Sequence, residues 1–174
     1  MKTKTAIFVI LGLLISAPAF ATPEHEHKMP APKVGSAEFE KIKALAGTWK
    51  GNTLLNGKEE PAEIDYKVTS NGSAVVETLF PGTPQEMVSV YTDHGGKLSM
   101  THYCAMGNQP QLDLAKTEGN TLDLAFSPSS GVQPGEDRMD SLKITIEGNK
   151  ITQTWTGQQG GKPGEPTVIS VQKV

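Results

Sequence analysis

The sequence predicts an all-β protein: an antiparallel up-and-down barrel of about ten strands, with one short N-terminal helix closing an end. Three observations predict this fold class. Turn dipeptides recur at short intervals, the segments between them alternate apolar and polar residues, and a single stretch shows helical spacing. The turn dipeptides are Asn56-Gly57, Asn71-Gly72, Pro81-Gly82, Gly95-Gly96, Gly107-Asn108, Gly119-Asn120 and Gly148-Asn149.

The expected helix follows Ser36, a good N-cap residue, and ends before Gly47. Acidic residues fall in its first turn and lysines fall later, which suits the helix dipole. The apolar residues with helical spacing are Phe39, Ile42 and Leu45.

Ten strands are expected after the helix, and no segment between them is long enough for a parallel crossover. A meander of ten strands either closes into a barrel or leaves two exposed edges, so we predict closure. A two-sheet sandwich is the alternative, with the same strands and a filled core. The predicted strands are Thr48–Leu55, Ala62–Ser70, Ser73–Phe80, Glu86–Asp93, Lys97–Met106, Pro110–Thr117, Thr121–Ser127, Met139–Glu147, Lys150–Gln158 and Thr167–Lys173.

Alternation with period two indicates which side chains face the interior. The strands at 73–80 and 86–93 are apolar on both faces and give no assignment. The residues assigned to the interior are Trp49, Ile64, Tyr66, Val68, Leu112, Leu114, Leu122, Leu124, Phe126, Leu142, Ile144, Ile146, Ile151, Gln153 and Trp155.

The chain divides into three parts: a signal peptide at 1–21, a flexible leader at 22–35 and the barrel domain at 36–174. The first part has two lysines, a short apolar run and Ala19-Phe20-Ala21 at its end, the pattern of a cleavable signal. The apolar run is shorter than a spanning helix, so stable membrane insertion is not expected. We therefore expect an exported protein, periplasmic or extracellular.

Composition excludes several classes of function. Lys and Arg together number 16 against 19 Asp and Glu, with Arg138 the single arginine, so the chain lacks the basic face that nucleic acid requires. The single Cys104 excludes an intramolecular disulfide, a zinc ribbon and a Cys-x-x-Cys redox centre. The oligomeric state is left open.

One predicted strand carries residues with ligand chemistry. Period two places Leu98, Met100, His102, Cys104 and Met106 on one face, which the apolar Leu98 suggests is the interior. Imidazole and soft sulfur favour haem or copper, bound by His102 with Cys104 or Met100. The alternative is ordinary core packing, in which a Gln, a Tyr or a water satisfies the imidazole.

The function predicted from these residues is an exported, non-catalytic protein that holds a small, hydrophobic or weakly polar molecule in a barrel cavity. The haem or copper carrier is one alternative, and a structural domain with a filled core is another. The sequence has no hydrolase, phosphate-loop or zinc-protease motif, so an enzyme is not the expected answer. The candidate ligand-binding residues are Tyr66, Met100, His102, Cys104, Phe126, Gln153 and Trp155.

The start of the first strand resembles that of a known superfamily. Gly47-Thr48-Trp49, directly after the helix, is similar to the Gly-x-Trp start of the calycins, the lipocalins and fatty-acid-binding proteins. The resemblance implies a barrel closed at one end by a helical turn, with the Trp packed over it. Lipocalins also place a basic residue late in the chain over that Trp, and fatty-acid-binding proteins use internal arginines. Arg138 lies beside a predicted loop, so neither role is assigned to it and a fatty-acid ligand is not expected.

The Thr101-His102-Tyr103-Cys104 segment, together with the same start, resembles exported bacterial proteins of uncharacterised function. This resemblance implies no chemistry. The longest connection, residues 127–138, is expected to be a flap at the cavity mouth or a disordered loop.

Overall fold

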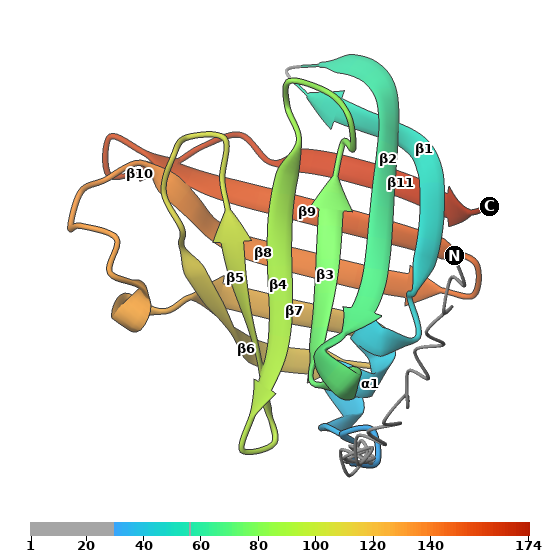
Figure 1. Ribbon diagram of the computed structural model, residues 1–174. Helices are drawn as coiled ribbons and strands as arrows, with labels where there is room; N and C mark the ends of the chain where they lie inside the picture. Colours follow the sequence, from blue (N-terminus) through green and yellow to red (C-terminus); the bar gives the residue numbers. More distant parts are fainter. Residues whose placement is uncertain (1–29, 56) are drawn as a thin grey trace, which may run out of the picture.

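The computed structural model describes residues 30–55 and 57–174 (Figure 1). The predicted signal peptide and residues 22–29 of the leader lie outside the described residues. The elements, in order, are α1 (Ala37–Lys43), β1 (Gly47–Leu55), β2 (Lys58–Thr69), η1 (Ser70–Gly72), β3 (Ala74–Leu79), β4 (Met87–His94), β5 (Lys97–Tyr103), β6 (Gln111–Glu118), β7 (Thr121–Phe126), η2 (Pro128–Ser130), β8 (Arg138–Glu147), β9 (Lys150–Gln159), β10 (Lys162–Pro163) and β11 (Thr167–Lys173).

The predicted closed antiparallel barrel of ten strands is confirmed. Strands β1 to β9 pair in chain order, and β11 pairs with both β9 and β1, which closes the sheet. The two-residue β10 is an addition beside β9. Closure leaves no free edge among the ten strands, and the sandwich alternative is wrong.

The predicted helix also forms, and Ser36 caps it. The Ser36 hydroxyl accepts a hydrogen bond from the backbone N–H of Phe39 at 3.2 Å. Phe39, Ile42 and Leu45 are buried against the barrel. Because α1 leads directly into β1 and contacts the end of β4 and the start of β5, it closes one end of the barrel (Figure 1).

Trp49 fixes the helix to the closed end. Its indole N–H donates to the backbone carbonyl of Leu45 at 2.7 Å, and its side chain is buried. The Nζ atom of Lys173 lies 5.4 Å from the Trp49 ring centroid. Lys173, near the end of β11, thus contacts the ring of Trp49 at the closed end.

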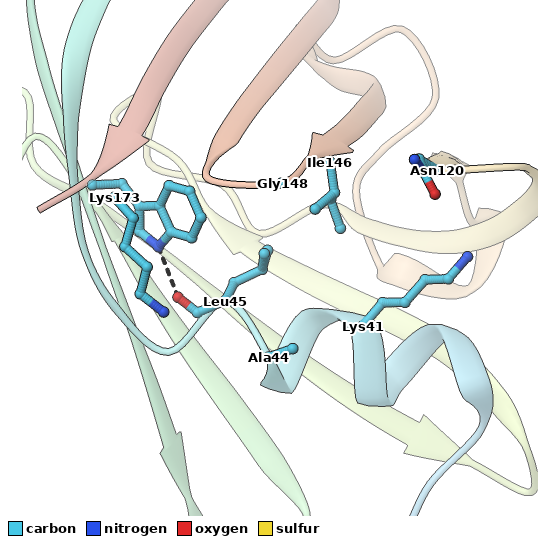
Figure 2. A pocket seen from close by; sticks show the side chains of 8 residues that line it. Lys41, Ala44, Leu45, Asn120, Ile146, Gly148 and Lys173 are labelled. Atoms are coloured by element: carbon cyan, nitrogen blue, oxygen red, sulfur yellow. Dashed lines mark hydrogen bonds between the residues drawn. The ribbon is translucent and has the colours of Figure 1, made fainter.

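The side chains in Figure 2 line a hollow of about 220 Å³ at this closed end, between α1 and the hairpin turns at Asn120 and Gly148. Lys41 reaches across it and donates to the carbonyl of Gly119 at 3.0 Å. The dashed line in Figure 2 is the hydrogen bond that joins the indole to Leu45, beside Lys173.

The predicted interior side chains face inward. Eleven of the fifteen are in the buried core: Trp49, Ile64, Tyr66, Leu112, Leu122, Leu124, Leu142, Ile144, Ile151, Gln153 and Trp155. Val68, Leu114 and Ile146 are partly buried and pack against this core. Strands β3 and β4, which sequence alternation could not assign, turn Glu77, Leu79, Ser89 and Tyr91 inward.

The described part of the leader lies against the turn at η1. The backbone N–H of Lys33 donates to the carbonyl of Asn71 at 2.9 Å, and the Asn71 side chain donates to the carbonyl of Pro30 at 2.9 Å. Asn71 has a φ of 51°, a left-handed conformation that Asn adopts more readily than most residues. Residues 30–35 thus form contacts with the barrel. Within the described chain, α1 and the two 3₁₀ turns all fall short of the length a membrane span needs.

Candidate functional site

A cavity of about 460 Å³ lies at the open end of the barrel, opposite α1. The lining residues belong to the end of β1, the start of β2, the β3–β4 connection, the end of β5 and the adjoining ends of β8, β9 and β11. The volume is in the range of small-molecule sites. The lining residues are Thr53, Leu55, Glu60, Pro61, Leu79, Phe80, Thr83, Gln85, Met87, His102, Ala105, Met139, Trp155, Thr167 and Ile169.

His102 is the buried polar side chain of the cavity wall with an unused hydrogen-bonding atom. Its Nδ1 lies 3.0 Å from the Ser89 hydroxyl, across the β4–β5 pair. Its Nε2 is buried and has no hydrogen-bond partner among the described residues. The whole residue is 1% exposed, and its ring lies 4.7 Å from the ring of Trp155, tilted by 42°. Nε2 is therefore a buried polar atom of a lining residue that has no partner among the described residues.

Burial determines the protonation state of this imidazole. Because a charged ring would be desolvated, the pKa of His102 falls from 6.5 to about 4. The ring is therefore neutral near pH 7, with one protonated and one bare nitrogen.

The buried carboxyl group of Glu77 interacts with Ser89. Burial raises the pKa of Glu77, and hydrogen bonds from Tyr66, Gln153, Ser89 and Tyr91 oppose that rise. The Tyr91 hydroxyl donates to Glu77 Oε2 at 3.1 Å, and the Gln153 amide donates to Oε1. Glu77 is fully buried, so these donors replace the water that it loses.

The same network reaches Trp155 in the cavity wall. The Gln153 amide also donates to the Tyr66 hydroxyl at 2.8 Å, and the Trp155 indole N–H donates to Gln153 Oε1 at 2.8 Å. The rings of His102 and Trp155 are thus connected to the carboxyl group of Glu77, the first through Ser89 and the second through Gln153.

The structure brings some of the predicted ligand-binding residues together and separates others. His102 and Trp155 line the cavity. Tyr66 and Gln153 lie behind the wall, as members of the Glu77 network. Met100 is buried but is not a lining residue.

The other two candidates lie away from the cavity wall. Phe126 is half-buried, and the Arg138 guanidinium lies 3.9 Å from its ring centroid. Arg138 in turn pairs with Asp140 at 2.8 Å. Cys104 follows the end of β5, where the chain turns: the N–H of Gly107 donates to its carbonyl at 2.9 Å.

The predicted row of ligating side chains on β5 is therefore shorter than expected. Leu98, Met100, His102 and Cys104 are buried at alternate positions, whereas Met106, beyond the end of β5, is 47% exposed. Burial raises the pKa of the Cys104 thiol, so the thiol form is favoured. Over residues 30–55 and 57–174, His, Cys, Asp and Glu side chains form no group of three that could hold a metal ion.

Comparisons with known proteins support the fold alone. This chain is similar to the crystal structure of Rv2717c from M. tuberculosis, with a TM-score of 0.57 and 10% sequence identity. The similarity covers 81% of this chain and 99% of Rv2717c. No protein-family model matches the chain, and no curated protein matches it. The function of the cavity is therefore inferred from the geometry of the cavity itself.

Apart from His102 and Trp155, the lining residues were not candidates from the sequence, and neither were Glu77 and Ser89 behind the wall. The strands of Glu77 and Ser89 carry apolar residues on both faces, so alternation could not show which face is buried. Glu77 is the polar member of an otherwise apolar inward set on β3, whereas Ser89 shares the inner face of β4 with the buried Asp93.

The neutral His102 predicts a pH dependence of stability. An unfolded His takes up a proton near pH 6.5, whereas the folded protein resists it until about pH 4. Because of His102, the free energy of unfolding should therefore fall by about 3 kcal/mol as the pH drops from 7 to 4. Above pH 7 the contribution of His102 to stability should be complete. Urea unfolding across this range measures the fall.

A His102→Phe variant isolates this contribution from the carboxyl groups, which titrate in both proteins. Glu77 contributes with the opposite sign, because its raised pKa lets the folded state take up a proton first. The variant should lose less stability than the wild type over this pH range. Equal pH dependence in the two proteins would contradict the neutral, buried state of His102.

Proposed function

We propose that this protein is an exported binding protein that holds a small, mostly apolar molecule in the cavity at the open end of its barrel. The observation that carries the proposal is the cavity itself, about 460 Å³ in volume and lined mainly by aliphatic, aromatic and thioether side chains. A few fixed polar groups in an apolar wall are typical of small-molecule sites, because they orient the ligand.

The distribution of buried residues supports a hollow open end. Near α1, Phe39, Ile42, Trp49 and their neighbours form a buried core beside the smaller hollow of about 220 Å³. Toward the mouth, Phe80, Met87 and Met139 are only partly buried, and they line the cavity instead of filling it. Residues 127–138, the expected flap, contribute no lining residue, and the mouth is formed by other connections.

We propose that the protein binds this molecule without catalysing a reaction. The Cys104 thiol does not line the cavity, and burial favours its protonated form, which is a weak nucleophile. We also propose a calycin-like relationship, supported by α1, Gly47-Thr48-Trp49 and the position of Lys173 over Trp49. Export rests on the predicted signal peptide, and N-terminal sequencing of the mature protein tests it.

Binding of N-phenyl-1-naphthylamine, a neutral probe that fluoresces in apolar surroundings, tests the proposed function. Ile169 is buried in the cavity wall, and Ser170 is its neighbour on the outer face of β11. Ile169→Trp should weaken probe binding by about tenfold or more, because the indole occupies the cavity. Ser170→Trp is the matched control and should leave binding unchanged.

Two results would contradict the proposal. The wild-type protein could fail to bind the probe, or Ile169→Trp could bind it as tightly as the wild type while remaining folded. Native mass spectrometry of the exported protein is an independent test, because a co-purifying small molecule adds its mass to the folded chain.

Haem held by His102 is a second candidate, and the bare Nε2 in the cavity wall is the observation that favours it. A ring nitrogen whose partner nitrogen is fixed by a hydrogen bond is the usual arrangement of an iron-ligating His. The cavity wall is a weaker fit, because its one charged lining residue, Glu60, would repel the haem propionates. Titration with haemin tests this candidate: a shifted absorption band that His102→Ala abolishes would support it.

A further inference from the structure

The unpartnered Nε2 of His102 limits the chemistry of the ligand. We propose that the bound molecule is neutral and carries a hydroxyl or N–H group that donates a hydrogen bond to this atom. The inference rests on the proposed function, since it names the class of molecule that the cavity takes.

The groups behind the ring favour Nε2 as the acceptor. The Ser89 hydroxyl has one proton, and its interaction with Glu77 favours the charged carboxylate, so we infer that Ser89 donates this proton to Glu77. The oxygen of Ser89 is then left to accept from Nδ1–H of His102, 3.0 Å away. A neutral imidazole protonated at Nδ1 presents a bare lone pair at Nε2.

An apolar ligand without a donor would leave that lone pair buried and unsatisfied. Leaving a buried acceptor without a partner is unfavourable and lowers the affinity for such a ligand. A ligand hydroxyl or N–H group that reaches Nε2 would supply the missing partner. The site therefore discriminates in favour of a molecule that supplies a donor at this point.

The charges around the cavity favour a neutral molecule. Glu60 is the one charged residue among the described lining residues, and Glu77 lies behind the wall. Arg138 does not line the cavity and is occupied by Phe126 and Asp140. A carboxylate would enter without a cation to pair with, which is costly in an apolar site.

Calorimetric binding of three probes tests the inference: 2-naphthol, its methyl ether 2-methoxynaphthalene, and 2-naphthoate. The first two share the apolar ring, and only the first can donate a hydrogen bond. We expect the wild-type protein to bind 2-naphthol about tenfold more tightly than the ether, a ratio that corresponds to about 1.4 kcal/mol. We expect 2-naphthoate to bind more weakly than both.

His102→Phe supplies the control, because phenyl keeps an aromatic ring beside Trp155 and removes both nitrogens. The variant should bind 2-naphthol and the ether with equal affinity. A second readout needs no variant: the ¹⁵N resonance of His102 Nε2 should shift when 2-naphthol is added to the wild-type protein and stay in place with the ether.

The outcomes separate the two claims. Equal binding of 2-naphthol and the ether by the wild type, or an unmoved Nε2 resonance, overturns the hydrogen-bond inference and leaves the proposed function standing. Tightest binding of 2-naphthoate overturns the preference for a neutral ligand. Failure of every probe, N-phenyl-1-naphthylamine included, overturns the proposed function and the inference with it.

Discussion

Replacing Glu77 with Leu is expected to lower the free energy of unfolding by about 3–5 kcal/mol. The reason is the set of donors that converge on this carboxyl group from Tyr91, Gln153 and Ser89. Leu cannot accept a hydrogen bond, so each buried donor is left unsatisfied at a cost of roughly 1–3 kcal/mol. A drop of this size is a large fraction of the stability of an ordinary domain.

Urea unfolding measures the effect, and Glu63→Leu is the matched control. Glu63 is on the outer face of β2, where it pairs with Lys50 at 3.0 Å and both side chains are solvent-exposed. Exposed pairs of this kind contribute about 0–1 kcal/mol. A loss below 1 kcal/mol for Glu77→Leu would show that the network behind the cavity does not stabilise the barrel.

Trp49→Ala is expected to cost about 3–5 kcal/mol in the free energy of unfolding. Trp49 is 2% exposed at the closed end, and its removal leaves a large void between α1 and the strands. It also leaves the carbonyl of Leu45 without the indole donor. The contact with Lys173 is lost as well.

Trp49→Phe separates packing from the polar contacts, because it keeps an aromatic ring and removes the indole N–H. Its loss should be smaller, and urea unfolding ranks the three proteins. Trp49 lies at the closed end and does not line the binding cavity. Folded Trp49→Phe protein should therefore bind N-phenyl-1-naphthylamine as the wild type does. Weakened probe binding would show that the two ends of the barrel are not independent.

The hairpins could be predicted because their causes are local. At Gly95 and Gly96 the turn needs φ values of 64° and 86°, which Gly adopts without strain. Each predicted strand overlaps an observed one, and the inward sets follow wherever one face is polar. The helix was equally local, because Ser36 and the spacing of Phe39 and Ile42 define its start and its buried face.

The parts that could not be predicted depend on contacts between distant residues. Closure rests on the pairing of β11 with β1, and alternation within a strand is the same in a sandwich. Glu77 and Ser89 could be placed only once β3 and β4 had a defined inner face. Cys104 is buried at the expected alternate position without lining the cavity, and no pattern within its own strand shows which buried side chains reach the cavity.

The leader illustrates the limit of compositional arguments. Its Pro and charged residues predict that the leader buries little apolar surface, but they do not predict its hydrogen bonds. Hydrogen bonding is a separate matter: Lys33 and Asn71 form backbone and side-chain bonds that no hydrophobic pattern signals.

A crystal structure of the wild-type protein grown with 2-naphthol tests the central claim most directly. We expect electron density for the ring between Trp155 and Ile169, with the naphthol oxygen about 2.7–3.2 Å from His102 Nε2. Side chains that fill the open end, or a naphthol bound elsewhere while Nε2 contacts only protein, would contradict it.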